Sequence, residues 1–134
     1  FFPDLAALRD DFSPDYVVVA YGTNDWNTLE EAEFKENCRS FYKRIRYNYP
    51  DAEIFALTPI WRADYKDKRA CGSFENIAAC IKESVSLLPN VNVIEGFHLV
   101  PHDERFFSDK YLHPNSVGFE HYFENLYGLI KELL

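Results

Sequence analysis

The chain has 134 residues, of which 47% are hydrophobic and 17% aromatic, and its formal net charge is −8. This apolar content excludes wholesale disorder, and the length is that of one folded domain, residues 1–134. The negative charge excludes a nucleic-acid partner and disfavours an anionic membrane surface, because both need a basic face. No apolar run approaches the roughly 20 residues that cross a bilayer, so no membrane span is expected.

The start of the chain and its cysteines bear on its location. The sequence contains no Met, so Phe1 is not expected to be the native translation start. The first residues lack the basic start and long apolar stretch of a secretory signal. Cys38, Cys71 and Cys80 are odd in number and follow no metal-ligand spacing. They favour free thiols in a reducing, cytoplasmic compartment, with a Cys71–Cys80 disulfide as the alternative, and no metal site is expected.

The first predicted elements are a short helix and a buried strand. Residues 4–12 favour a helix because Leu5, Leu8 and Phe12 recur on one face. A Ser-Pro-Asp turn follows and ends it. The continuous β-branched and aromatic run of residues 16–21 then predicts a strand that is buried on both faces, as in a parallel sheet.

A long helix and a second strand are predicted next. Thr28 and Glu31 have the spacing of a capping box, which marks a helix start, and the Tyr-Pro-Asp run at residues 49–51 marks its end. Residues 53–58 favour the second strand. The expected inward residues of the helix are Phe34, Cys38, Phe41, Tyr42 and Ile45.

The second half of the chain repeats the alternation. A polar loop is expected over residues 62–72, a helix capped by Ser73, a third strand over residues 91–94, and an irregular loop over residues 96–115. In the helix after Ser73, the side chains expected to face the core are Ile77, Ile81, Val85 and Leu88. In the last helix, the side chains expected to line the inner face are Phe119, Tyr122, Phe123, Leu126, Ile130 and Leu133.

The order of these elements predicts the fold class. Strands that alternate with crossover-length helices form right-handed βαβ units, so we expect an α/β protein with a small parallel sheet of three strands and flanking helices. In such sheets ligands bind beyond the carboxyl ends of the strands. The segments that follow the three strands should therefore converge on one edge and form the site.

Polar residues follow each of the three predicted strands. Gly22, Asn24 and Asp25 follow the first, Trp61 and Arg62 the second, and Asp109 and His113 lie in the loop after the third. An Asp and a His a few residues apart can act as the orienting acid and the general base of a hydrolytic triad. An Asn side chain on a strand-end turn can donate to an oxyanion. Each block also has a purely structural interpretation as turn or loop residues.

The first and third of these groups resemble two sequence blocks of the SGNH (GDSL-type) hydrolase superfamily. Gly22, Asn24 and Asp25 match a G-x-N-D block, and Asp109, His113 and Pro114 resemble a D-x-x-H-P block, with three residues instead of two between the acid and the base. The resemblance implies a three-layer, flavodoxin-like fold of which this chain holds the last three strands.

The resemblance also implies roles for these residues. The resemblance would make Asn24 the oxyanion donor, His113 the general base and Asp109 its orienting acid, with Gly22 and Asp25 near the substrate. It implies hydrolysis of a small-molecule ester by a Ser-His-Asp mechanism that needs no cofactor. Trp61 and Arg62, by their place after the second strand and apart from the resemblance, could hold an acyl or sugar group at the rim of the site or make a plain loop contact.

The nucleophile is the part of that mechanism we do not find. The family's G-D-S-x-S block would lie upstream of Gly22 and is not in this sequence, and no G-x-S-x-G elbow is present. Ser108 and Cys71 are the nearest substitutes, and both are disfavoured. The chain alone is therefore expected to be inactive. The alternative function is a non-catalytic domain on the same scaffold that binds a small ligand or carbohydrate.

The truncation implied by the resemblance also predicts a partner. The strand of residues 16–21 would lose its inner neighbour and become an apolar edge, which is a template for strand pairing. We expect a second copy of the chain, a complementing fragment or a rearranged N-terminal segment to cover it.

Overall fold

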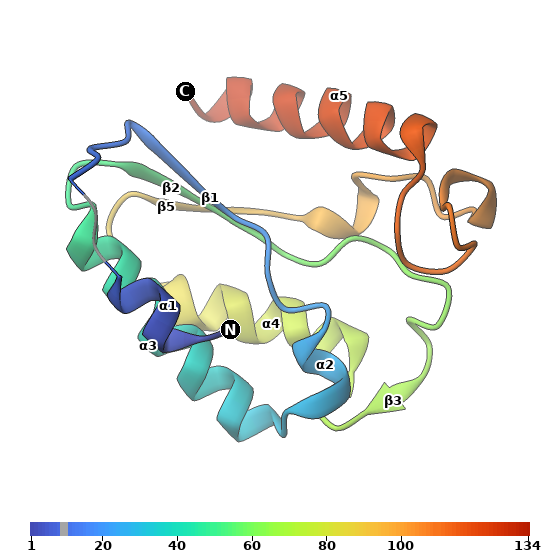
Figure 1. The fold of residues 1–134 in the computed structure, drawn as a ribbon, viewed down its shortest axis with the longest axis horizontal. Helices are drawn as coiled ribbons and strands as arrows, with labels where there is room; N and C mark the ends of the chain where they lie inside the picture. The colour runs from blue at the N-terminus through green and yellow to red at the C-terminus, as the bar shows by residue number, and fades with distance from the viewer. Residues whose placement is uncertain (9–10) are drawn as a thin grey trace.

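The computed structural model describes residues 1–8 and 11–134 (Figure 1). Its main sheet has three parallel strands in the order β1-β2-β5, namely β1 (Tyr16–Val19), β2 (Glu53–Leu57) and β5 (Val91–Ile94). Each crossover contains a helix, as expected for parallel neighbours. The predicted α/β fold with a three-stranded parallel sheet is confirmed, although β1 is shorter than residues 16–21.

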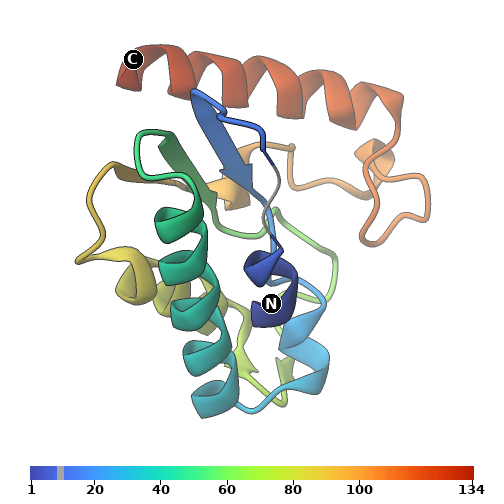
Figure 2. The ribbon, with the colours of Figure 1, turned by 60° about the vertical axis from the view of Figure 1, so that its left-hand side comes forward.

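Helices cover both faces of this sheet (Figures 1 and 2). Helices α3 and α4 lie on one face, α5 lies on the other, and α1 packs against α3. The bounds are α1 (Pro3–Ala7), α2 (Asp25–Thr28), α3 (Glu31–Asn48), α4 (Phe74–Val85) and α5 (Ser116–Leu133). Smaller elements are the hairpin of β3 (Lys68–Arg69) and β4 (Gly72–Ser73), and the 3-10 helices η1 (Gly96–His98) and η2 (Glu104–Phe106).

The larger core lies between the sheet and the α3–α4 layer. The apolar stripe predicted for the helix after Thr28 faces it, because side chains three and four positions apart share one side of a helix. Phe34, Cys38 and Tyr42 are fully buried there, beside Ile77 and Ile81 of α4. This packing fixes the sheet on the helix layer and so fixes where each strand ends.

The first helix is shorter than predicted. α1 ends at Ala7 because Leu8 takes an extended conformation, with φ −67° and ψ 128°. Leu5, Leu8 and Phe12 are exposed rather than inward, and residues 9 and 10 of the predicted helix lie outside the described residues. The reason is that Phe1 fills the available core position, where its ring contacts four other aromatic rings.

The predicted helix caps are also corrected. Thr28 is the last residue of α2, and α3 begins after Glu30, which makes no side-chain cap. The strand-end turn forms its own short helix, so the chain needs the extended residue Leu29 before α3 can start. Ser73 stands at the N-cap position of α4, but its hydroxyl bonds the Asn76 side chain instead of a backbone N–H.

Helix α5 buries only part of its predicted inner face. Tyr122, Leu126 and Ile130 pack on the sheet, whereas Phe119, Phe123 and Leu133 are 56%, 65% and 47% exposed. The helix lies over β2 and β5 (Figure 1), so one of its flanks extends beyond the sheet contact. The predicted stripe is therefore wider than the surface on which it packs.

Strand β1 leaves apolar surface uncovered on the α5 side of the sheet. Its register pairs Val18 with Phe55, so both side chains point toward α5. Tyr16 and Val18 are nevertheless 54% and 51% exposed. β1 pairs with β2 on one side, and no other strand of the described residues pairs with its outer edge. A partner for this edge remains a prediction.

The three cysteines are free and buried in the larger core. Burial raises the pKa of the Cys38 thiol to about 12 and that of Cys71 to about 11. Cys71 and Cys80 are therefore not joined in this structure. Within the described residues, no helix has the length and apolarity needed to cross a membrane.

Candidate active site

Three segments that follow strands meet at the carboxyl edge of the sheet. They enclose a pocket of about 320 Å³ that is lined mainly by apolar surface. The polar side chains that matter for chemistry are Asn24, from the turn after β1, and His113, from the loop before α5. The full lining is Ala20, Tyr21, Thr23, Asn24, Leu57, Thr58, Pro59, Ile60, Leu112, His113, Pro114, Phe119 and Tyr122. Residues nearly ninety positions apart in the sequence thus share one cavity.

Asp109 and His113 form a hydrogen-bonded pair. His113 Nδ1 lies 2.7 Å from Asp109 Oδ2. An ionised carboxylate only accepts hydrogen bonds, so Nδ1 carries the proton in this pair and Nε2 is left as the basic nitrogen. The His113 side chain is 74% exposed, which leaves Nε2 open to a reacting group.

A tight turn holds the Asp109 carboxylate in place. Its Oδ1 accepts from the backbone N–H groups of Tyr111, Leu112 and His113 at 2.9, 2.8 and 3.1 Å. These bonds, that of Leu112 first, together with the His113 ring hold the pKa of Asp109 well below its usual range. The loop accommodates its extra residue because Lys110 adopts a left-handed backbone conformation, with φ 57°. The acid and base therefore meet despite the three residues between them.

Gly22 sets the direction of the turn that carries Asn24. Its φ is 113°, a conformation that side-chain-bearing residues rarely adopt, and a Cβ there would lie 3.0 Å from Ile77 Cγ2. Asn24 is the residue before α2, yet its side chain makes no cap bond to that helix. The carboxamide therefore stays exposed at the pocket.

Asp25, Trp61 and Arg62 do not line this pocket. Asp25 begins α2, and its side chain is not part of the pocket lining. Trp61 is 7% exposed and packs against Phe107, and Arg62 is only 2% exposed. The prediction that Trp61 and Arg62 form the rim of the site is therefore corrected, because both side chains turn into the protein.

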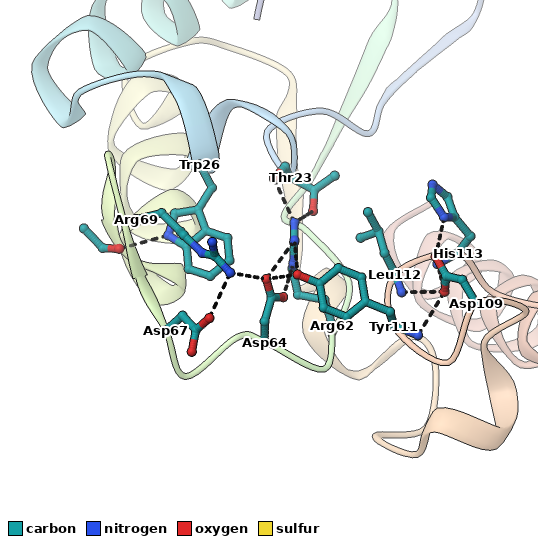
Figure 3. A network of polar contacts seen from close by, with 11 residues as sticks. Thr23, Trp26, Arg62, Asp64, Asp67, Arg69, Asp109, Tyr111, Leu112 and His113 are labelled. Carbon is teal, nitrogen blue, oxygen red and sulfur yellow. Dashed lines mark hydrogen bonds and ion pairs between the residues drawn. The ribbon is translucent and has the colours of Figure 1, made fainter.

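Sequence reasoning missed the residues that surround Arg62. Asp64 and Tyr111 both bond its guanidinium (Figure 3). The only available signal was the opposite charge of Asp64 two positions after Arg62, since nothing in the spacing connects either residue to Tyr111.

No serine of the described residues lines the pocket. Ser108 is the nearest to His113 in sequence, but its hydroxyl donates to the His113 backbone oxygen at 3.0 Å. Cys71 is fully buried. In the same part of the chain, no group of three or more His, Cys, Asp or Glu side chains is placed to hold a metal ion.

The three-stranded parallel sheet with helices on both faces defines an α/β fold, and the candidate site lies at the carboxyl ends of its strands. A family model gives the narrower result: residues 2–121 match the GDSL-like lipase/acylhydrolase family, and the chain belongs to that family. No curated protein matches the sequence.

Solved structures share the fold. The chain is similar to the salicylyl-acyltransferase SsfX3 of a tetracycline biosynthetic pathway, with a TM-score of 0.78 and 22% identity over 98% of this chain and 41% of that one. A family 3 carbohydrate esterase from Talaromyces cellulolyticus gives a TM-score of 0.64 and 18% identity over 90% and 58% of the two chains.

A family 2 carbohydrate esterase plus carbohydrate-binding domain from Corynascus gives a TM-score of 0.57 and 25% identity over 84% and 34% of the chains. The present chain thus spans about a third to three fifths of the length of these structures.

Proposed function

We propose that this chain supplies the general base, its orienting acid and the oxyanion donor of a serine-dependent ester hydrolase. The observation that carries the proposal is the 2.7 Å contact between His113 and Asp109, beside a pocket that His113 shares with Asn24. Family membership supports this chemistry, since the matched family is one of lipases and acylhydrolases.

The proposed reaction proceeds by acyl transfer in two steps. A serine Oγ attacks the ester carbonyl while His113 Nε2 accepts its proton, and the Asn24 amide donates to the oxygen that becomes negative. The carbon–oxygen bond to the alcohol then breaks, and the same proton passes from His113 to the leaving oxygen. A water molecule then attacks the acyl carbon while His113 Nε2 accepts its proton; the bond between that carbon and the serine Oγ breaks, the proton passes to the serine oxygen, and the acid leaves.

We propose that the serine comes from outside these 134 residues. No serine of the described residues lines the pocket, and the structures that share the fold are longer than this chain. The exposed edge of β1 is the surface to which a further strand would bind, because its outer backbone groups are unpaired in this sheet and its neighbouring side chains are apolar.

The mainly apolar lining and modest size of the pocket favour a substrate with a small acyl group. Its volume of about 320 Å³ lies at the lower end of ligand sites, and the apolar part of its surface comes from side chains such as Ile60, Phe119 and Tyr122. We therefore propose short-chain or acetyl esters of a small molecule as the substrate class.

The test is hydrolysis of p-nitrophenyl acetate by the 134-residue chain and by the full translation product of the same gene. We expect the chain alone to be inactive and the full product to be active. His113→Ala should lower kcat of the full product by at least about 10³-fold, and Asn24→Ala by about 10²–10³-fold. His98→Ala is the matched control, since His98 is exposed and does not line the pocket.

Three results would contradict parts of this proposal. Turnover by the chain alone that is lost in His113→Ala would place the nucleophile within these residues. An active full product that tolerates His113→Ala would refute the assignment of the base. A full product that binds acetate or an acetylated sugar without hydrolysing any ester would favour the non-catalytic ligand-binding function.

A further inference from the structure

One buried charge has no part in the acid–base pair described above. The Arg62 side chain is 2% exposed, although a buried guanidinium costs free energy unless all its donors are satisfied. Its Nε and Nη2 face the two carboxylate oxygens of Asp64, with Nη2 3.0 Å from Oδ2. Burial alone would lower the pKa of Arg62, but its hydrogen bonds to Asp64 and Tyr111, together with the charge of Asp64, outweigh burial and raise this pKa. The Arg62–Asp64 ion pair therefore holds the guanidinium in one position within the fold.

The remaining donors of Arg62 reach the two segments that carry the proposed catalytic groups. Nη1 donates to the backbone oxygen of Thr23 at 3.2 Å, one residue before Asn24. Nη2 also donates to the hydroxyl of Tyr111 at 3.3 Å, two residues before His113. Figure 3 shows the guanidinium between these two segments.

Aromatic rings hold the guanidinium in this position. Its carbon lies 5.0 Å from the ring centre of Trp26 and 5.4 Å from that of Tyr111, within the range of cation–π attraction. Tyr111 is further tied to the Arg62 segment, because its backbone oxygen accepts from Ala63 N at 3.0 Å and its hydroxyl contacts Asp64.

We propose that Arg62 is a positioning residue that sets the separation of Asn24 and His113. This inference rests on the function proposed above for those two side chains. Arginine suits the task because its planar fork presents five donors in fixed directions, so one side chain can bind Asp64, Thr23 and Tyr111 together. A lysine ammonium carries its donors on one nitrogen and lacks the planar fork that faces these three partners in different directions.

The chain contains a matched control for this proposal. Arg69 also donates to Asp64 Oδ2, at 2.9 Å, and its guanidinium lies 5.4 Å from the ring centre of Trp26. It is more exposed, at 36% of its side chain, and it bonds Asp64 and Asp67 rather than Thr23 or Tyr111 (Figure 3). Arg69→Met therefore removes an ion pair on the same carboxylate and leaves the link between the two catalytic segments intact.

The first test uses amide hydrogen exchange on the 134-residue chain, which needs no catalytic activity. The reporters are the N–H groups of Leu112 and His113, bonded to Asp109, and that of Trp26, which is bonded to the Gly22 oxygen. Arg62→Met should speed exchange at both sets by on the order of tenfold, while Arg69→Met should not. Arg62→Lys should fail to restore protection.

Tyr111→Phe keeps the ring and removes only the hydroxyl that Arg62 bonds. It therefore tests the same link even if the Arg62 variants do not fold. It should speed exchange at Leu112 and His113 without affecting Trp26. Equal changes in Arg62→Met and Arg69→Met, or unchanged exchange in Tyr111→Phe, would overturn the proposal.

The second test measures kcat and KM of the full translation product. A misplacement of about 1 Å between catalytic groups costs on the order of 10²-fold in rate, so Arg62→Met should lower kcat by that amount with little change in KM. A rise in KM at constant kcat would overturn the positioning role. If His113→Ala were tolerated while the exchange results held, the proposed function would fail and the structural link through Arg62 would stand.

Discussion

The two glycines of α5 give a matched pair of substitutions with opposite expected signs. Gly128 lies in the helix interior, and a Cβ built there has no atom within 4 Å. Gly118 lies in the first turn, and a Cβ there would come within 2.2 Å of the Phe106 backbone oxygen and 3.1 Å of Pro114 Cβ. The same change, Gly to Ala, therefore meets open space at one position and backbone at the other.

The magnitudes follow from these contacts. Gly128→Ala should stabilise the protein by about 1 kcal/mol, the difference in helix propensity between the two residues. Gly118→Ala should destabilise it by about 1–3 kcal/mol, because a backbone atom cannot move away as cheaply as a side-chain end. For a chain of 134 residues these changes correspond to roughly +4 °C and −4 to −12 °C in Tm.

The assay is thermal and urea unfolding followed by circular dichroism at 222 nm. Gly118→Ala should also disturb the loop that carries His113, because Phe106 O accepts from Asn115 N at 2.9 Å at the end of that loop. Faster exchange at His113 in Gly118→Ala, and not in Gly128→Ala, would show it. A Gly118→Ala variant as stable as the wild type would refute the close approach of α5 to Phe106.

Three other predictions concern the turn, the thiols and the sheet edge. The low pKa of Asp109 means that its bonds stabilise the turn above about pH 4 and are lost as pH falls further. The protection of the His113 N–H, relative to an unstructured peptide at the same pH, should therefore fall in acid, and Asp109→Ala should abolish this dependence. Cys38 and Cys71, buried and with raised pKa values, should react with iodoacetamide at pH 8 only after unfolding, and fast labelling of the native chain would contradict their burial. Val18→Lys should reduce self-association of the isolated chain in size-exclusion chromatography, and a wild-type chain that elutes as a monomer at all concentrations would argue against pairing through β1.

The sequence determined the order of the three main strands and their crossover helices, and the edge of the sheet where the candidate site lies. Continuous apolar runs mark parallel strands, and their alternation with helices leaves one way to connect them, so Asn24 and His113 had to follow strand ends. The long helical stripe from Phe34 to Ile45 was equally clear, because a period of 3.6 residues over many positions is a strong signal.

Local signals were less reliable where tertiary contacts compete with them. Thr28 and Glu31 have the spacing of a capping box, yet the turn after β1 forms the short helix α2, and Thr28 is the last residue of that helix. Leu5 and Leu8 have helical spacing, but the core near α1 is filled by Phe1. A cap or a short stripe contributes about 1 kcal/mol or little more, which packing readily overrides.

Only the tertiary structure decided what Arg62 does. Its position after a strand end suggested a substrate contact, but the direction of its side chain depends on Thr23 and Tyr111, which lie 39 and 49 positions away. The meeting of Asp109 and His113 across three residues likewise depends on the left-handed conformation of Lys110. Hydrophobic periodicity specifies which face of an element is buried, whereas the directions of polar side chains arise from contacts that form only when distant segments pack together.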